Sequence, residues 1–290
     1  MECKICPREC GVERSLKRGV CGMPENFVVA RAAKHYWEEP CISGTEGSGT
    51  VFFSGCSLRC IFCQNYHIST ENFGKEISDK RLTEIFDTLI EQGAHNINLV
   101  NPTHYSLRLK KVLTEYKSPV PVVWNSGGYE KTETLKQLEG LVDVYLPDLK
   151  YINAEKSLKY SSAENYFEYA SGAIKEMIRQ TGPARFDSNG IMKKGTIIRH
   201  LILPKNTNQS IQIIEWLKDN VPSDTYISLM SQYTPISNND KYPELNRKIT
   251  SREYEKVLYA LEESGFKNCF IQQINSSDTK FIPNFNLEGV

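Results

Sequence analysis

The sequence from Phe52 to Asn65 reads FFSGCSLRCIFCQN and holds three cysteines at the spacing C-x3-C-x2-C. Residues 50–53 have the composition of a short buried strand, so the cysteines lie on the loop that follows it. Iron–sulfur cubanes usually take four cysteines, but the next ones along the chain, Cys41 and Cys269, are distant in sequence. A cluster held by three thiolates leaves one iron open, as a catalytic zinc site leaves one position for its reactant.

Two other interpretations of Cys56, Cys60 and Cys63 are a structural zinc loop and three unrelated buried thiols. Structural zinc takes four ligands, usually from pairs of cysteines well separated in sequence, which this loop does not offer. With Gly55 before the motif and Phe62 before its last cysteine, the loop resembles the signature of the radical S-adenosylmethionine superfamily. We favour this interpretation because the spacing is far more selective than a lone C-x-x-C.

Length and composition fit one sizeable α/β domain. The chain has 290 residues, 40% of them hydrophobic, and equal numbers of basic and acidic residues, 35 of each. A balanced charge gives no field to attract nucleic acid or an acidic membrane, so we expect neither as a partner. The first residues contain no apolar signal region and no stretch is long enough for a membrane helix. Nine cysteines without a secretion signal indicate metal ligation in a reducing cytoplasm.

Residues 1–24 carry four further cysteines, Cys3, Cys6, Cys10 and Cys21. The segment has too few apolar residues for a core of its own, so a metal would have to hold its shape. A tetracysteine zinc site is the interpretation we favour, and a second iron–sulfur cluster is the alternative. We expect a separate site with a structural role, whose deletion would spare the cluster of the main domain.

Residues 25–48 are expected to form a linker and cover segment, so the predicted domains are 1–48 and 49–290. From residue 49 onward, strand and helix patterns alternate. Helices are predicted at 78–92, capped by Ser78, and at 250–264, where Thr250 and Glu253 form a capping box. The remaining helices are expected at 106–117, 131–139, 154–182 in two pieces, and 208–220. Strands are expected at 96–100, 120–124, 142–146, 195–203 and 225–230, with a seventh or edge strand at 270–274.

This alternation predicts a parallel sheet with right-handed crossovers. Six strand–helix units make an incomplete barrel, so the predicted fold is an α/β, partial (β/α)6 TIM-type barrel with a small cysteine-rich N-terminal segment. In such a barrel the reactive residues gather where strands end. The predicted strand ends carry polar side chains, namely Asn101, Thr103, His104, Asn125, Ser126, Asp148, Lys150, Arg199, Gln232 and Tyr233. Arg199 and His200 are neighbours on a strand and face opposite ways, and we expect Arg199 to face the interior.

Within the superfamily the chain resembles pyruvate formate-lyase activating enzymes and their iron–sulfur relatives with an N-terminal cysteine-rich segment. The matching stretches are Gly55 to Asn65, Asp148-Leu149-Lys150 and residues 198–204. The resemblance implies a radical core that binds S-adenosylmethionine beside the cluster. It implies that Phe62, Gln64 and Asn65 of the loop contact the cofactor. Asp148 and Lys150 would contact its methionyl portion or ribose, and Asn125 and Ser126 its ribose or ammonium. Tyr233 would lie by the adenine, with Gln232 beside it.

One stretch departs from that family. Activating enzymes commonly carry Gly-Gly-Glu after the second strand, where this chain has Asn101-Pro102-Thr103-His104. The proline removes one N–H donor from that turn. The cofactor's ammonium would then be held by the Asn101 carbonyl or the Thr103 hydroxyl. His104 and Arg199 are the candidates for the substrate side of the site.

The function that the resemblance implies is a radical S-adenosylmethionine oxidoreductase. A 4Fe-4S cluster on Cys56, Cys60 and Cys63 would cleave the cofactor reductively to a 5′-deoxyadenosyl radical, which takes a hydrogen atom from the substrate. The first substrate hypothesis is a glycine of a partner enzyme, as in glycyl radical enzyme activation, and a peptide or small metabolite is the alternative. An iron–sulfur electron carrier or redox sensor is the non-enzymatic alternative. The implied partner is a one-electron donor of the flavodoxin or ferredoxin type.

Overall fold

The computed structural model describes residues 2–235, 240–274 and 283–290. Its centre is one curved sheet in which the strand order is β10-β9-β8-β6-β5-β4-β2-β1-β3. Every neighbouring pair from β2 to β10 along this path is parallel. The path ends at two edges in the described part of the chain, so the barrel is open. This arrangement confirms the predicted mainly parallel, partial α/β barrel.

The parallel strands lie within a few residues of the predicted ones. Their bounds are β2 Ser48–Phe53, β4 Ile97–Val100, β5 Val122–Ser126, β6 Val144–Pro147, β8 Met192–Leu201, β9 Tyr226–Met230 and β10 Asn268–Ile271. β2 is buried along its whole length, as the apolar run predicts. The pattern near 270 proves to be a parallel edge strand beside β9.

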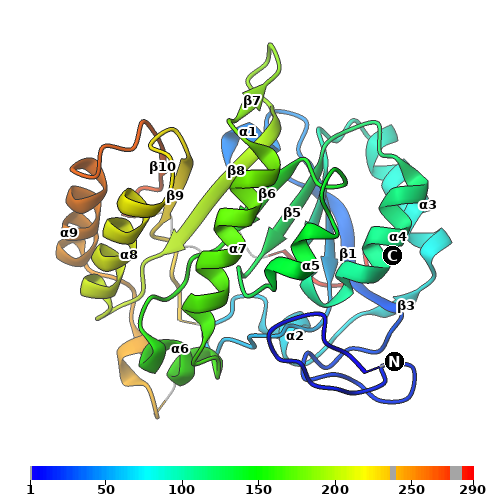
Figure 1. Cartoon of the computed structure of the whole chain (residues 1–290), viewed down its shortest axis with the longest axis horizontal. Coiled ribbons are helices and arrows are strands. Elements are labelled where there is room, and N and C mark those ends of the chain that lie inside the picture. The colour runs from blue at the N-terminus through cyan, green and yellow to red at the C-terminus, as the bar shows by residue number, and fades with distance from the viewer. Residues whose placement is uncertain (1, 236–239, 275–282) are drawn as a thin grey trace.

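Helices alternate with the strands and cover the outside of the sheet (Figure 1). Their bounds are α3 Asp79–Glu91, α4 Ser106–Tyr116, α5 Thr132–Lys136, α6 Ala154–Ser161, α7 Tyr166–Thr181, α8 Thr207–Asn220 and α9 Ser251–Glu262. The Ser78 side chain accepts from the Arg81 N–H at the start of α3, and Thr250 and Glu253 form the predicted capping box of α9. The 154–182 segment is two helices, as expected.

The segment expected as a linker is the main difference from the sequence prediction. Residues 25–48 contain strand β1, Phe27–His35, and the short helix α1, Pro40–Ser43. β1 pairs antiparallel with β2 and with β3, Lys75–Ile77, and therefore extends the sheet. The alternation rule missed β1 because it stands outside the strand–helix repeat and joins the sheet as an antiparallel strand.

Short elements complete the chain. They are α2 Tyr66–Ser69 after the cysteine loop, the 3-10 turns η1 Thr103–Tyr105 and η2 Pro243–Asn246, and β7 Arg185–Phe186, which pairs antiparallel with β8. In Figure 1 the parallel strands point toward the lower edge of the view, where the N-terminal segment lies beside α2, and α1 lies at the other end of the sheet. None of the helices in the described ranges has the length and apolar character of a membrane-spanning helix.

Candidate active site

The three cysteines of the loop are held at the carboxyl end of β2. Cys60 is buried, and the Ser161 hydroxyl at the end of α6 donates to its sulfur at 3.0 Å. The Leu58 N–H donates to the Cys56 sulfur at 3.4 Å, and the Cys63 N–H donates to the Cys60 carbonyl at 3.0 Å. Arg59 takes a left-handed backbone (φ +49°), which turns the chain tightly between the first two cysteines.

Gly55, just before the first of these cysteines, is a position that only glycine fits. Its φ is +79°, and a Cβ there would lie 2.3 Å from the Met23 side chain and 2.6 Å from the Cys21 carbonyl oxygen. Its carbonyl accepts from the Asn101 amide, and its N–H donates to the Ile68 carbonyl at 2.8 Å. The loop is thus pressed between α2, the end of β4 and the N-terminal segment.

A cavity of about 260 Å³ opens beside this loop, at the carboxyl ends of the parallel strands. Cys56, Cys60 and Cys63 all line it. Ten of the side chains predicted to bind the cofactor line it as well: Phe62, Gln64, Asn65, Asn101, Asn125, Ser126, Asp148, Lys150, Arg199 and Gln232. Residues from the loop and from five strands therefore meet at one place, as the strand-end rule predicts.

A chain of buried charges lines the same cavity as the cysteines. The Arg199 guanidinium donates to Asp148 at 2.9 Å, to the Asn125 side-chain oxygen at 2.6 Å and to Glu38 at 3.2 Å. Asp148 also pairs with Lys150. His200 points away from the cavity, with its ring between the Leu149 carbonyl and the Ser210 hydroxyl. Of the two neighbours on β8, Arg199 is thus the one that faces the interior.

The charges act on one another and on the thiols. Burial by itself would raise the pKa of Asp148, but the cations of Arg199 and Lys150 outweigh it and the pKa lies below its usual value. Burial would lower the pKa of Lys150, but Asp148 and the Cys60 thiolate reverse this and raise the pKa to about 12. Burial raises the pKa of Cys60 to about 12, against the nearby Lys150 charge. A metal bound by Cys60 would displace the proton of its thiol, since a coordinating thiol is deprotonated outright.

The hydroxyl of Tyr166, which sequence reasoning did not single out, fixes the turn that carries Asp148 and Lys150. It donates to the Asp148 carbonyl at 2.7 Å or to the Gly127 carbonyl at 2.9 Å, and it accepts from the Lys150 N–H at 2.9 Å. These contacts hold the backbone of the turn in one position. The two charged side chains therefore start from a fixed base.

Three predicted site residues do not line this cavity. Thr103 donates to the buried Glu130 at 3.0 Å, and the ring of His104 contacts the Ser54 carbonyl at 2.8 Å. Both lie on η1, which turns back into the core directly after β4, and burial lowers the pKa of His104 to about 3. The Tyr233 hydroxyl donates to the Leu245 carbonyl at 2.7 Å. The substrate role considered for His104 and the ammonium contact considered for Thr103 are therefore wrong for this cavity.

Sequence reasoning missed the contribution of the segment between β1 and α1. His35, Trp37 and Glu38 all line the cavity. The Glu38 carboxylate accepts from the amides of Asn98 at 3.2 Å and Asn125 at 3.1 Å, in addition to Arg199. Burial raises the pKa of Glu38 and Arg199 opposes this. No spacing motif marks Glu38, and its only signal is an acid pair beside an apolar strand pattern.

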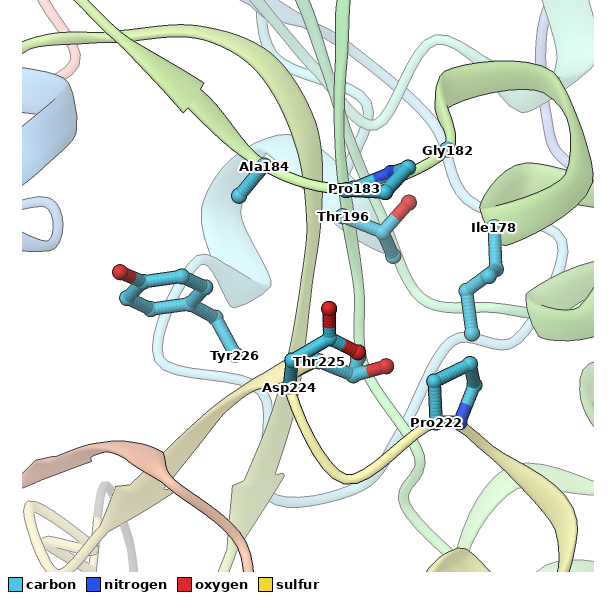
Figure 2. Close-up of a pocket in the computed structure, with 9 residues that line it drawn as sticks. All are labelled: Ile178, Gly182, Pro183, Ala184, Thr196, Pro222, Asp224, Thr225 and Tyr226. Atoms are coloured by element: carbon cyan, nitrogen blue, oxygen red, sulfur yellow. The ribbon is translucent and has the colours of Figure 1, made fainter.

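A second cavity, of about 210 Å³, lies where β8 and β9 begin, at the other end of the sheet (Figure 2). Its walls are mostly apolar, with Ile178, Pro183, Ala184 and Pro222 around it. Asp224 is the one charged residue among the nine that line it. No cysteine or histidine is among these nine residues, and we assign no chemistry to this cavity.

The donor set of the first cavity fits an iron–sulfur cluster with one open iron. Among the described residues three cysteines and no fourth line it, together with acceptors and cations for a zwitterionic ligand. Asp148 and Glu38 would accept from an ammonium, and Lys150 would donate to a carboxylate. Asn125, Gln64 and Gln232 add amides that can bind ribose hydroxyls.

Comparison with known proteins agrees with this donor set. A family model described as a 4Fe-4S single cluster domain matches residues 42–166. The uncharacterized protein MJ0674 of Methanocaldococcus jannaschii is 31% identical over 271 residues, which cover 90% of this chain and 74% of that protein.

Two solved structures are similar in fold. Methylornithine synthase (PylB) has a TM-score of 0.51 at 14% identity, covering 81% of this chain and 68% of that protein. SuiB of Streptococcus suis, bound to S-adenosylmethionine, has a TM-score of 0.50 at 15% identity, covering 75% of this chain and 48% of SuiB. The chain belongs to the family of MJ0674, its residues 42–166 match a 4Fe-4S single cluster domain, and its fold is similar to those of PylB and SuiB.

Proposed function

We propose that this protein is a radical S-adenosylmethionine oxidoreductase that removes a hydrogen atom from its substrate. The observation that carries the proposal is the meeting of three cluster-loop thiols with Asp148, Lys150, Arg199 and Asn125 around one cavity. An electron carrier or redox sensor has no need of such a wall. Its cluster would also normally have four protein ligands.

The cluster and S-adenosylmethionine, once bound and given one electron, supply a 5′-deoxyadenosyl radical. The residues of the chain bind, orient and shield. Lys150 places a positive charge near the thiolates of Cys60 and Cys63. Leu58 and Phe62 give the cavity apolar walls that keep water away from a reactive species.

Arg199 acts through its neighbours. It is satisfied on three sides, by Glu38, Asp148 and Asn125, so it orients the groups that face the ligand. Glu38, in the segment that joins β1 to α1, both accepts from Arg199 and lines the cavity. The wall therefore keeps its shape before a ligand arrives, which lowers the cost of ordering it on binding.

The first substrate that we propose is a glycine of a partner enzyme, by the resemblance of the loop and of Asp148-Leu149-Lys150 to activating enzymes. The second candidate is a peptide. SuiB, whose fold this chain shares, has also been solved bound to its precursor peptide SuiA, with a TM-score of 0.50 at 14% identity. A small metabolite is the third, and the reductant would be a flavodoxin or ferredoxin in the cytoplasm.

Electron spin resonance of the reduced, reconstituted protein with candidate substrates tests this choice. A stable radical on the partner's glycine, split by its α-hydrogen, is the result expected for a glycyl radical enzyme. Consumption of S-adenosylmethionine that rises with a peptide, without a stable partner radical, would favour the peptide. Cofactor turnover that no protein or peptide stimulates would leave the metabolite.

A further inference from the structure

The N-terminal segment is held together by very little regular structure. Residues 2–24 contain no helix and no strand, only an isolated bridge between Glu2 and Glu13. The turns are closed by main-chain hydrogen bonds, such as Cys3 N–H to the Val12 carbonyl at 2.9 Å and Gly11 N–H to the Cys3 carbonyl at 3.1 Å. A chain of this length without a core of its own needs another source of order.

Its four cysteines are close together. A Cβ on Gly19 would lie 3.3 Å from the Cys21 sulfur and 3.5 Å from the Cys10 sulfur, so both thiols face this residue. The Cys3 side chain hydrogen-bonds to Cys10. Cys6 is buried, and the other three thiols are all close enough to interact electrostatically with its sulfur.

Main-chain N–H groups face three of these sulfurs in the same way. Cys6 receives the N–H of Arg8, Cys10 that of Val12, and Cys21 that of Met23, in each case from two residues further on. Main-chain donors and the neighbouring thiols therefore surround the same sulfurs.

In the described part of the chain no three cysteine, histidine or acidic side chains are already drawn together around a single metal ion. This applies equally to Cys56, Cys60 and Cys63, whose cluster the family match supports. The spacing of unliganded thiols therefore does not distinguish the two groups of cysteines. A measurement of the metal content of the protein is needed to distinguish them.

The segment also lies directly against the cluster loop. The Cys56 N–H donates to the Cys21 carbonyl at 3.2 Å, so a main-chain hydrogen bond joins a cysteine of one group to a cysteine of the other. The Arg8 guanidinium donates to the Ser57 carbonyl at 2.7 Å and to the Ser161 carbonyl at 2.9 Å. Since Ser161 in turn donates to the Cys60 sulfur, Arg8 joins both sides of the loop. The contacts link two sites that the sequence led us to treat as separate.

We propose that Cys3, Cys6, Cys10 and Cys21 bind a metal centre of their own, and that this centre fixes the N-terminal segment as a clamp on the loop of Cys56, Cys60 and Cys63. The ligand is a thiophilic metal, either a zinc ion or an iron–sulfur cluster. Four protein thiolates close its coordination, so it does not bind substrate. The site lies outside residues 42–166, which the family match covers.

Metal analysis of two variants tests the first half independently of the proposed radical chemistry. The Cys56→Ala/Cys60→Ala/Cys63→Ala protein, which keeps the N-terminal thiols, should retain about one zinc or about four iron per chain after anaerobic reconstitution. Changing Cys3, Cys6, Cys10 and Cys21 to Ser should remove that metal. Zinc would identify a structural ion and iron a second cluster. A triple variant that retains no metal would overturn the proposal, whatever the wild type does with S-adenosylmethionine.

The clamp is tested by how fast an iron chelator bleaches the loop cluster. Arg8→Ala keeps all four N-terminal thiols but cuts the contacts to Ser57 and Ser161, so bleaching should be severalfold faster than in the wild type. Lys17→Ala, at an exposed position of the same segment, is the matched control and should not change the rate. If Arg8→Ala and the four-Ser variant both bleach at the wild-type rate, the segment is no clamp.

Discussion

The two groups of cysteines differ in what surrounds them. Cys56, Cys60 and Cys63 line a cavity that buried acids, cations and amides line as well. The four N-terminal cysteines line neither of the two cavities described above, and the sulfurs of Cys10 and Cys21 both lie beside Gly19. Three thiols beside a cavity leave a metal position open to a ligand, whereas four thiols close it. The count of cysteines and the space beside them thus separate a reactive centre from a structural one.

The largest effect is expected at Cys56, Cys60 and Cys63, the open group, whose three thiols leave a metal position free for a ligand; the closed group is Cys3, Cys6, Cys10 and Cys21. Cys60→Ala should abolish reductive cleavage of S-adenosylmethionine, a loss of more than about a hundredfold, because two thiolates do not retain the cluster. The same assay on Cys10→Ala should still give turnover, since that residue belongs to the closed group. Cys269→Ala, far from both groups, is the control. If Cys10→Ala were as inactive as Cys60→Ala, the contrast between the groups would fail.

The second largest effect is expected at the charged side chains that line the cavity beside Cys56, Cys60 and Cys63. Lys150→Ala should weaken S-adenosylmethionine binding roughly ten- to a hundredfold, the usual range for losing a hydrogen bond to a charged group, while the cluster still assembles. Asp148→Ala should behave similarly. Titration calorimetry measures the dissociation constant, with Lys193→Ala as a control on an ion pair away from the cavity. Unchanged binding in both variants would reduce Asp148 and Lys150 to a structural ion pair.

The third effect is expected where the N-terminal segment contacts the loop of Cys56, Cys60 and Cys63. Gly55→Ala introduces a Cβ against Met23 and the Cys21 carbonyl at φ +79°, so the loop or the N-terminal segment must shift. Strain of this kind costs on the order of 1–3 kcal/mol, and we expect roughly tenfold less cluster per chain after reconstitution. Gly93→Ala is the matched control, because its φ is +84° and nothing lies within 4 Å of the added atom. Equal iron content in the two variants would show that the loop and the N-terminal segment can shift apart at Gly55 without loss of the cluster.

The smallest effect is expected from an exposed contact that also joins the segment to the barrel. Glu9 pairs with Lys131 at 2.5 Å, and the hydrogen bond from Lys131 lowers the pKa of Glu9. A lowered acid pKa stabilises the folded state above the unfolded pKa, and the benefit is lost as the pH falls through the folded pKa. Glu9→Gln should therefore melt slightly lower than the wild type at neutral pH, and the difference should vanish once the pH falls below the lowered pKa of Glu9. A difference that persists in acid would have another cause.

Much of the barrel could be predicted from the sequence because its signals are local. Apolar runs mark the parallel strands β2, β4, β5, β6, β8, β9 and β10, the caps at Ser78 and Thr250 mark helix starts, and the cysteine spacing marks the loop. The side chains at the strand ends follow from the topology, since parallel strands bring their carboxyl ends to one edge. The inward orientation of Arg199 follows from the two-residue period of a strand.

The residues that sequence reasoning misplaced depend on non-local contacts. Glu38 belongs to the site only because β1 folds back along β2 and delivers it to Asn98, Asn125 and Arg199. Thr103 and His104 follow a strand end, but η1 turns them into the core, where Glu130 and the Ser54 carbonyl receive them. The link from Cys21 to Cys56 joins segments with no shared pattern.

We propose that the cavity beside Cys56, Cys60 and Cys63 performs radical chemistry on S-adenosylmethionine. Anaerobic reconstitution, chemical reduction and chromatography for 5′-deoxyadenosine test this proposal. We expect the wild type to release 5′-deoxyadenosine and the Cys60→Ala protein to release none. A wild-type protein with a full, reducible cluster that binds S-adenosylmethionine but releases no 5′-deoxyadenosine, with or without candidate substrates, would contradict it and leave an electron carrier or sensor.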